Sequence, residues 1–220
     1  MAHRTFKSKL YPEFARIGMA LASDKRLELL DLLSQGPRYV DALAAEMEMS
    51  VANVSQHLQA LRGAHLVEAE REGNRVRYRL TDDSVLRLWL GLRTVAEEHL
   101  PEIRELRDRY AVEGVDEALP REELESLLRA GDAVLIDVRP ALEYGDGHIA
   151  GALAVPVEEL PRRMDELPRD KRIVAYCRGA YCLFADEAVA LLRSRGFDAI
   201  RLEGGWPEWK AERRSAEPSA

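Results

Sequence analysis

Apolar positions recur along this chain with one period in its first half and another in its second. From Tyr11 to Gln35 they follow helical spacing, which predicts two helices. Ser23 is a suitable N-cap for the second helix, and Gly36-Pro37 is a stop signal at its end. The chain is therefore expected to begin with an α-helical region.

A second pair of short helices is predicted next. The amphipathic stretch that forms the first of them contains Val40, Leu43, Ala44 and Met47. Glu48-Met49 follows as a turn, and Ser50 is a cap for a helix from Val51 to Arg62. Two short helices joined by a tight turn are typical of a helix-turn-helix motif.

The helix from Val51 to Arg62 has an apolar face and a polar face. The apolar stripe is predicted to contain Val51, Val54, Leu58 and Leu61. The outward positions are Ala52, Asn53, Ser55, Gln56 and Gln59. Small and amide side chains suit the base edges of the major groove, where Gln and Asn bind adenine bidentately. An ordinary solvated face is the alternative.

A hairpin follows, with strands predicted at Val67–Arg71 and Arg75–Leu80 around the turn Glu72-Gly73-Asn74. Its second strand alternates apolar residues with arginines. Such a basic hairpin is expected to lie along the DNA phosphates or in the minor groove. The predicted DNA contacts are Ser50, Asn53, Ser55, Gln56, His57, Gln59, Arg71, Arg75, Arg77 and Arg79. A helical pattern then resumes after Thr81 and extends to Tyr110.

In the second half, helices alternate with buried strands. The helices are predicted at Pro120–Ala130 and Ala180–Arg195, and the strands at Ala133–Val138, Ala152–Val155, Ile173–Tyr176 and Ala199–Leu202. This alternation predicts an α/β fold with a parallel sheet. We expect residues 1–110 to form the DNA-binding and dimerisation domain, 111–119 a linker, 120–214 the α/β domain and 215–220 a disordered tail.

Length and charge agree with two domains. The chain has 220 residues, enough for two domains of about 100 residues each. Basic and acidic residues balance at 14 each in residues 1–100, so the net charge of −7 falls on residues 101–220. A nucleic-acid surface therefore belongs to the first half. No apolar run of a membrane span's length and no secretory signal is present, so a cytoplasmic protein without membrane association is expected.

The two cysteines, Cys177 and Cys182, bound a six-residue loop between a predicted strand and a predicted helix. Backbone N–H groups in such a loop, together with the helix N-terminus, stabilise an anion and lower the pKa of a thiol. The pattern predicts a thiolate or a persulfide at Cys177, with a buried inert cysteine as the alternative.

The helix-turn-helix region contains Ser55-Gln56-His57-Leu58, Leu66-Val67 and the hairpin ending Tyr78-Arg79-Leu80. On these residues Asp24–Leu80 resembles the ArsR family of winged-helix repressors. The resemblance implies a homodimer on a palindromic double-stranded DNA operator, released by an inducer. Metal-sensing members carry a cysteine pair in the helix before the recognition helix. Residues 38–43 have none, and His99 with Glu102 offers only half of a zinc site, so we expect neither metal nor cofactor.

Four motifs occur in order in the second half. They are Asp137-Val138-Arg139 with Glu143-Tyr144, Gly147-His148-Ile149-Ala150-Gly151-Ala152, the cysteine loop, and Gly204-Gly205-Trp206 with Trp209. Together they resemble a rhodanese domain. The resemblance implies that Cys177 accepts a sulfane sulfur as a persulfide, held by the amides of a loop that includes Arg178, Gly179, Ala180 and Tyr181. Asp137 and Arg139 would support the site's scaffold. The loop is one residue shorter than in the related phosphatases, which disfavours phosphoryl chemistry.

The loop departs from the common rhodanese pattern in two places. Its glycine, Gly179, is at the third position, and its last residue is Cys182 rather than arginine or threonine. Arg178 either supplies the missing positive charge or faces solvent. Cys182 either attacks a persulfide on Cys177 or is a small core residue.

These features predict a DNA-binding transcriptional regulator, expected to be a repressor, whose rhodanese-like domain senses sulfane sulfur or oxidants through a persulfide at Cys177. Its partners would be operator DNA, a second copy of the chain and a sulfur donor such as polysulfide, persulfide or thiosulfate. One alternative is a sulfurtransferase enzyme tethered to a DNA-binding module. Another is a plain dithiol redox switch between Cys177 and Cys182.

Overall fold

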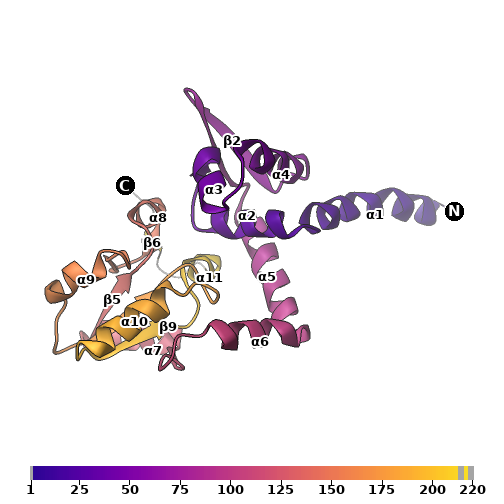
Figure 1. The fold of residues 1–220 in the computed structure, drawn as a ribbon. Helices are drawn as coiled ribbons and strands as arrows, with labels where there is room; N and C mark the ends of the chain where they lie inside the picture. Colours follow the sequence, from indigo (N-terminus) through magenta and orange to yellow (C-terminus); the bar gives the residue numbers. More distant parts are fainter. Residues whose placement is uncertain (1, 213–215, 218–220) are drawn as a thin grey trace. The chain divides into compact units, whose positions relative to one another are not determined.

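The computed structural model describes residues 2–212 and 216–217. The chain forms two compact units, residues 1–91 and 92–220 (Figure 1). Their boundary lies inside α5 (Asp83–His99), upstream of the segment 111–119 that the sequence predicts as a linker. Over the described residues, no helix combines the length and the apolar character that crossing a bilayer requires.

The first unit is mainly helical. Its elements are α1 (Ala2–Leu21), α2 (Asp24–Ser34), β1 (Arg38–Tyr39), α3 (Val40–Glu46), α4 (Val51–Gly63), β2 (Val67–Glu72), β3 (Arg75–Leu80) and the start of α5. The three strands form an antiparallel sheet in the order β1-β3-β2. Glu48, with φ of +51°, makes the turn between α3 and α4. The predicted winged helix-turn-helix arrangement is confirmed.

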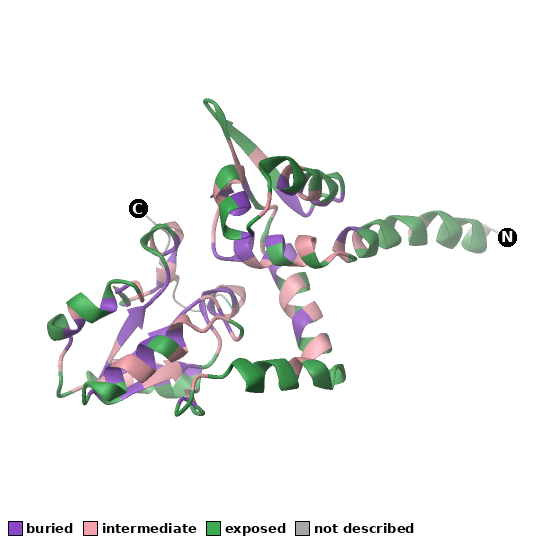
Figure 2. Ribbon diagram, viewed as in Figure 1, coloured by how far each residue is buried: buried purple, intermediate pink, exposed green. Residues whose placement is uncertain are grey.

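Leucines and valines from α2, α3 and α4 form the core of this unit. Val54, Leu58 and Leu61 of α4 are fully buried, as their spacing predicts. Val51 is different: it is 47% exposed, so its assignment to the inward stripe is wrong. Val51 is the first residue of α4, where the helix has only begun to pack against its neighbours. Most of α1 is exposed (Figure 2).

The second unit is an α/β domain preceded by the end of α5 and by α6 (Pro101–Tyr110). Its further helices are α7 (Arg121–Ala130), α8 (Ala141–Asp146), α9 (Leu160–Arg163), a 3₁₀ turn (Met164–Glu166), α10 (Phe184–Ser194) and α11 (Trp206–Ala211). Its strands are β4 (Ala118–Leu119), β5 (Ala133–Asp137), β6 (His148–Ile149), β7 (Leu153–Ala154), β8 (Arg172–Tyr176), β9 (Ala199–Leu202) and β10 (Ala216–Glu217).

Five strands form a parallel sheet in the order β4-β9-β8-β5-β7, as the alternating pattern predicts. Successive side chains of a strand point to opposite faces of the sheet. On β8, Ile173 and Ala175 belong to one apolar cluster, whereas Val174 and Tyr176 belong to another. Each face of the sheet therefore has a core of its own, and the strand is buried on both sides.

Some boundaries differ from the predictions. The helix after the cysteine loop begins at Phe184 and not at Ala180. The segment 111–119, predicted as a linker, contributes β4 and the buried side chain of Val115 to the second unit. The predicted disordered tail, 215–220, lies outside the described residues except for β10, which pairs with β6.

Candidate functional site

The outer face of α4 carries most of the predicted base contacts. Asn53, Gln56 and Gln59 are exposed, whereas Ser55 and His57 are half-buried. The Ser50 hydroxyl accepts a hydrogen bond from the Asn53 backbone N–H at 3.3 Å, which makes Ser50 the helix cap. The Gln59 amide donates to the Tyr78 hydroxyl at 3.3 Å and thereby ties α4 to β3. Asn53 and Gln56 are exposed amides of the kind that the predicted base contacts need.

The arginines of the hairpin lie beside acidic residues, and the sequence analysis did not predict these ion pairs. In the register of β2 and β3, Arg75, Arg77 and Arg79 stand opposite Glu72, Glu70 and Glu68. Cross-strand partners share one face of the sheet, so this face alternates both charges. Arg79 pairs with Glu68, and Arg77 lies 3.9 Å from Glu72.

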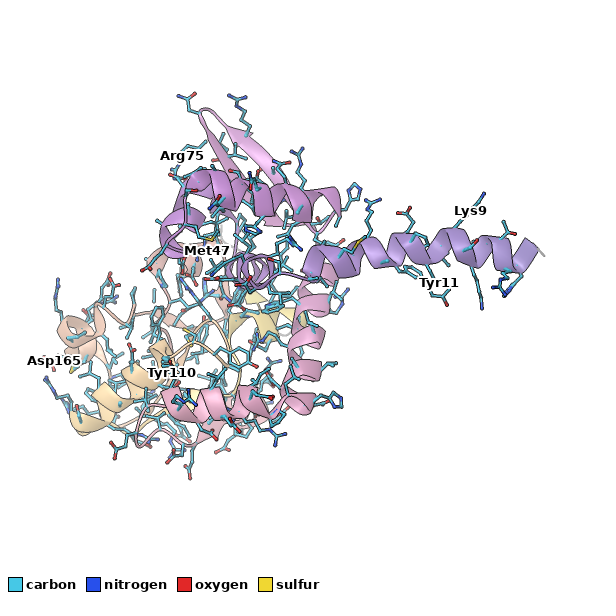
Figure 3. All side chains as sticks on the ribbon, turned by 45° about the vertical axis from the view of Figure 1, so that its right-hand side comes forward. Lys9, Tyr11, Met47, Arg75, Tyr110 and Asp165 are labelled. Atoms are coloured by element: carbon cyan, nitrogen blue, oxygen red, sulfur yellow. The ribbon has the colours of Figure 1, made fainter. Side chains whose placement is uncertain are left out.

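Arg75 (labelled in Figure 3) is also held within the first unit. It bonds both oxygens of Asp41, at 2.9 and 3.1 Å, and its guanidinium stacks 3.6 Å from the centre of the Tyr39 ring. The Arg71 guanidinium lies on the other face of the hairpin and donates to the Gly73 carbonyl at 3.2 Å. All four predicted arginines are therefore on the hairpin, and each has a partner.

In the second unit, Cys177 continues the alternation of β8. It follows Tyr176 and belongs to the same cluster as Ile173 and Ala175, packed with residues of α10. This position leaves Cys177 only 2% exposed. The burial was readable from the sequence, because Cys177 is the next inward position of the strand. Cys182 packs against the same cluster but is only partly buried.

The two thiols are neighbours. The Cys177 thiol donates to the Cys182 carbonyl oxygen at 3.2 Å and to the Gly179 carbonyl oxygen at 3.8 Å, and it interacts with the Cys182 side chain. Burial raises the pKa of Cys177, and the hydrogen bond to Cys182 raises it further. Backbone N–H groups of Gly179 and Ala185 act in the opposite direction. The expectation that loop amides lower the pKa of Cys177 is wrong for the free thiol, because burial outweighs them.

Cys182 shows the opposite behaviour. The hydrogen bond from Cys177 lowers the pKa of Cys182, although burial opposes this effect. Backbone N–H groups of Arg178 and Phe184 and the charge of Arg178 also favour its thiolate. The loop therefore holds a thiol at Cys177 beside a more acidic thiol at Cys182.

Arg178 neither faces solvent nor points at the sulfur atoms as an uncommitted cation. Its guanidinium donates to both oxygens of Glu143 in α8, with Nε at 2.9 and 3.1 Å. Glu143 is 1% exposed, so this is a buried ion pair. Glu143 was not among the predicted site residues, although it belongs to the motif that includes Asp137 and Arg139.

Asp137 and Arg139 form a second buried pair. Both are fully buried, and the guanidinium bonds both carboxylate oxygens. Arg139 also donates to the Gly147 carbonyl at 2.7 Å and stacks 5.4 Å from the centre of the Trp206 ring. This pair joins the end of β5 to Gly147 after α8 and to Trp206, the first residue of α11. Its contacts fit a scaffold role better than direct chemistry.

The backbone of the cysteine loop rests on Gly205 and Glu208. A Cβ atom at Gly205 would lie 2.4 Å from the Cys177 carbonyl oxygen and from the Gly179 nitrogen, so only glycine fits there. The Glu208 carboxylate accepts from the Gly205 N–H at 2.9 Å and lies 3.0 Å from the position of a Cβ at Gly179. Ala180 is half-buried and Tyr181 is 44% exposed. Glu208 was missed, although a Glu at N3 that accepts from the N-cap N–H is one half of a capping box.

Comparison with known families finds two matches. Residues 23–69 match the family described as bacterial regulatory protein, arsR family, and residues 120–212 match the rhodanese-like domain. The chain is 44% identical over 204 residues to the HTH-type transcriptional regulator Rv0324 of Mycobacterium tuberculosis, across 93% of this chain and 90% of that protein.

Two solved structures are similar to separate parts of the chain. One is a homodimeric winged helix-turn-helix DNA-binding domain, Mb0332 of Mycobacterium bovis, with 47% identity over 43% of this chain and 87% of that chain and a TM-score of 0.41. The other is the rhodanese-like domain of Alr3790 from Anabaena sp., with 36% identity over 46% of this chain and 78% of that chain and a TM-score of 0.41.

Proposed function

Since the chain belongs to the ArsR family of helix-turn-helix transcriptional regulators and carries a rhodanese-like domain, we propose that its affinity for operator DNA is controlled by sulfane sulfur bound at the Cys177–Cys182 pair. The contact of the buried Cys177 thiol with Cys182, whose carbonyl oxygen accepts from it at 3.2 Å, carries this proposal. A buried sulfur acceptor beside a more acidic thiol suits the capture of one sulfur atom and its slow release, which is what a sensor needs.

The chemistry balances without an added oxidant. Cys177 attacks the terminal sulfur of a persulfide or polysulfide, and the S–S bond of the donor breaks. The Cys177 proton passes to the Cys182 thiolate, the donor leaves as a thiolate one sulfur shorter, and Cys177 keeps the outer sulfur as a persulfide. If Cys182 then attacks the inner sulfur, a Cys177–Cys182 disulfide forms and the outer sulfur leaves as hydrogen sulfide.

The electrostatics of the loop favour a donor that carries little charge. Glu143 neutralises Arg178, so this guanidinium does not offer an unopposed charge to a dianion such as thiosulfate. Efficient turnover of thiosulfate is therefore disfavoured, and the protein acts as a sulfur sensor more than as a sulfurtransferase.

The DNA-binding form is a homodimer. Apolar side chains along α1 are exposed in the single chain, among them Phe6, Tyr11, Phe14 and Met19, each about 60% exposed. Figure 3 shows Tyr11 projecting from α1 on the side opposite Lys9. Exposed apolar side chains in this number are covered by a second copy of the chain. The two α4 helices then read two half-sites of a palindromic operator.

The test is a binding titration on the operator with and without polysulfide. The wild-type chain should lose affinity by about 5- to 150-fold after treatment, and mass analysis should show one added sulfur on the Cys177 peptide. Cys177→Ser should bind DNA as the wild type does and keep its affinity after treatment. If polysulfide releases the Cys177→Ser variant from the operator as strongly as it releases the wild type, the proposal is contradicted.

The same samples separate the alternatives. A plain dithiol switch would show the loss of two hydrogens across Cys177 and Cys182 without added sulfur at any time, whereas the proposed route passes through the Cys177 persulfide before any disulfide forms. A sulfurtransferase would form thiocyanate from cyanide at rates typical of enzymes, with DNA binding indifferent to sulfur.

A further inference from the structure

Helix α5 is the one continuous element that both units share among the described residues. Its first turns belong to the core of the first unit, where Val85 is buried and Trp89 donates from its indole N–H to Asp31 at 3.1 Å. Its last turns, from Leu92 to His99, belong to the second unit. A helix is a stiff body, so a displacement of its end is transmitted along its length.

Within the second unit, the end of α5 contacts the cysteine loop directly. The Arg93 guanidinium stacks 4.8 Å from the centre of the Tyr181 ring, and the Tyr181 hydroxyl donates to Glu97 at 2.5 Å. Arg93 and Glu97 are four positions apart and therefore lie on the same face of the helix. Tyr181 is the residue immediately before Cys182, so the contact reaches the sulfur-binding loop itself.

Arg93 also supports the cysteine loop indirectly, through Glu208. Its Nη1 lies 3.0 Å from Glu208 Oε1, and the same carboxylate packs against Gly179 and accepts from the Gly205 N–H. Arg93 is only 7% exposed, which is unusual for an arginine and indicates a fixed position. One guanidinium thus links α5 to the loop through Tyr181 and through Glu208.

The loop cannot take up sulfur without moving. Cys177 is 2% exposed in a packed cluster, and a further sulfur atom needs space that such an interior does not hold. Tyr181 has room to be displaced, since it borders a cavity of about 240 Å³ that Thr94 and Ile103 also line. Displacement of Tyr181 would break its hydrogen bond to Glu97 and its stacking on Arg93.

We propose that Arg93 and Glu97 are positioning residues that transmit the sulfur state of the Cys177–Cys182 loop to α5, by way of Tyr181 and Glu208. In the reduced loop the contacts are made and α5 is held. Sulfur uptake displaces the loop, the contacts are lost, and α5 carries the change into the first unit. This inference rests on the proposed function, and it names the route of regulation.

The test measures sulfur uptake and DNA release separately, in full-length chains. Glu97→Gln weakens the acceptor of the Tyr181 hydroxyl and leaves both cysteines in place. We expect it to gain sulfur at Cys177 as the wild type does, by mass analysis. Its ratio of operator affinities before and after polysulfide should fall from about 5- to 150-fold to near 1. Glu98→Gln, an exposed carboxylate one position along α5, is the matched control and should keep the wild-type ratio.

Arg93→Gln should also take up sulfur at Cys177 without releasing DNA. Its ratio of operator affinities before and after polysulfide should fall at least as far as in Glu97→Gln. Because Arg93 is buried, the thermal unfolding of the Arg93→Gln variant is measured first. If this variant does not fold, Glu97→Gln alone provides the test. If the wild type responds to polysulfide and Glu97→Gln keeps the full ratio, the relay is wrong and the proposed function stands. If the wild type itself shows no change in affinity, the proposed function is wrong.

Discussion

The polar groups on the predicted DNA-reading face of α4 are exposed, whereas those around the cysteine loop are buried. On α4, Asn53 and Gln56 are exposed to solvent. In the loop region, Asp137, Arg139 and Glu143 are buried and each charge has a partner of opposite sign. A surface that reads DNA exchanges water for base edges and must stay open. A loop that controls the reactivity of a thiol needs a fixed, dry environment, so its stability depends on buried polar contacts.

The largest expected effect of this difference is on stability. Asp137→Ala leaves the Arg139 guanidinium buried without its carboxylate, and we expect the unfolding free energy of the second unit to fall by about 3–5 kcal/mol. Asp198→Ala breaks the exposed pair with Arg172 and should cost about 0–1 kcal/mol. Urea denaturation followed by circular dichroism measures both. Equal losses would remove the distinction between the buried and exposed polar groups.

A smaller effect is expected on α4, and it should appear in DNA binding alone. Gln56→Ala should cost about 1–3 kcal/mol of discrimination at one base pair of each half-site, because its amide reads a base edge. Unfolding should change by no more than about 0.5 kcal/mol, since the side chain is exposed. Competition titrations with single-base operator variants provide the measurement, with Glu28→Ala on α2 as a surface control. A uniform loss across all variants would assign Gln56 to the phosphate backbone instead.

The smallest effect concerns the acidity of Cys182. In the wild type, the hydrogen bond from Cys177 holds the pKa of Cys182 below its ordinary value. Cys177→Ala removes the donor, so the pKa should rise and alkylation of Cys182 should reach its half-maximal rate at a higher pH. Below the ordinary thiol pKa of about 8.5, the wild-type Cys182 should react faster than Cys182 in the variant. Cys177→Ser keeps a hydroxyl donor and should lie between the two. A lower midpoint in Cys177→Ala would contradict the assignment.

Periodic and local signals in the sequence were enough to predict the main helices and strands. The strand Arg75–Leu80 and the cap Ser50 are as predicted, because alternation and capping are local properties. The two-residue strands β1, β4 and β6 are too short to carry a period. The helix after the cysteine loop begins late, because Gly179 has φ of +127° and Leu183 is the N-cap of α10.

The partners of the site residues could not be predicted in the same way. Glu143 with Arg178 and Glu208 with Arg93 join segments that are distant along the chain, so only the tertiary fold brings them together. Glu208 could have been recognised as a helix cap, but not as the acceptor of Arg93. The pKa direction at Cys177 was predicted wrongly for a related reason: the loop pattern shows the amides but not the packing that outweighs them.

The alternating charges of the hairpin bear on how the protein finds its operator. Binding to random DNA depends almost wholly on cations that neutralise phosphates. Glu68 and Glu72 already neutralise arginines of the same hairpin. The hairpin therefore adds little to the affinity for non-specific DNA. Weak retention by the bulk of the genome shortens each unproductive encounter and leaves the choice of site to the base contacts that we propose for α4.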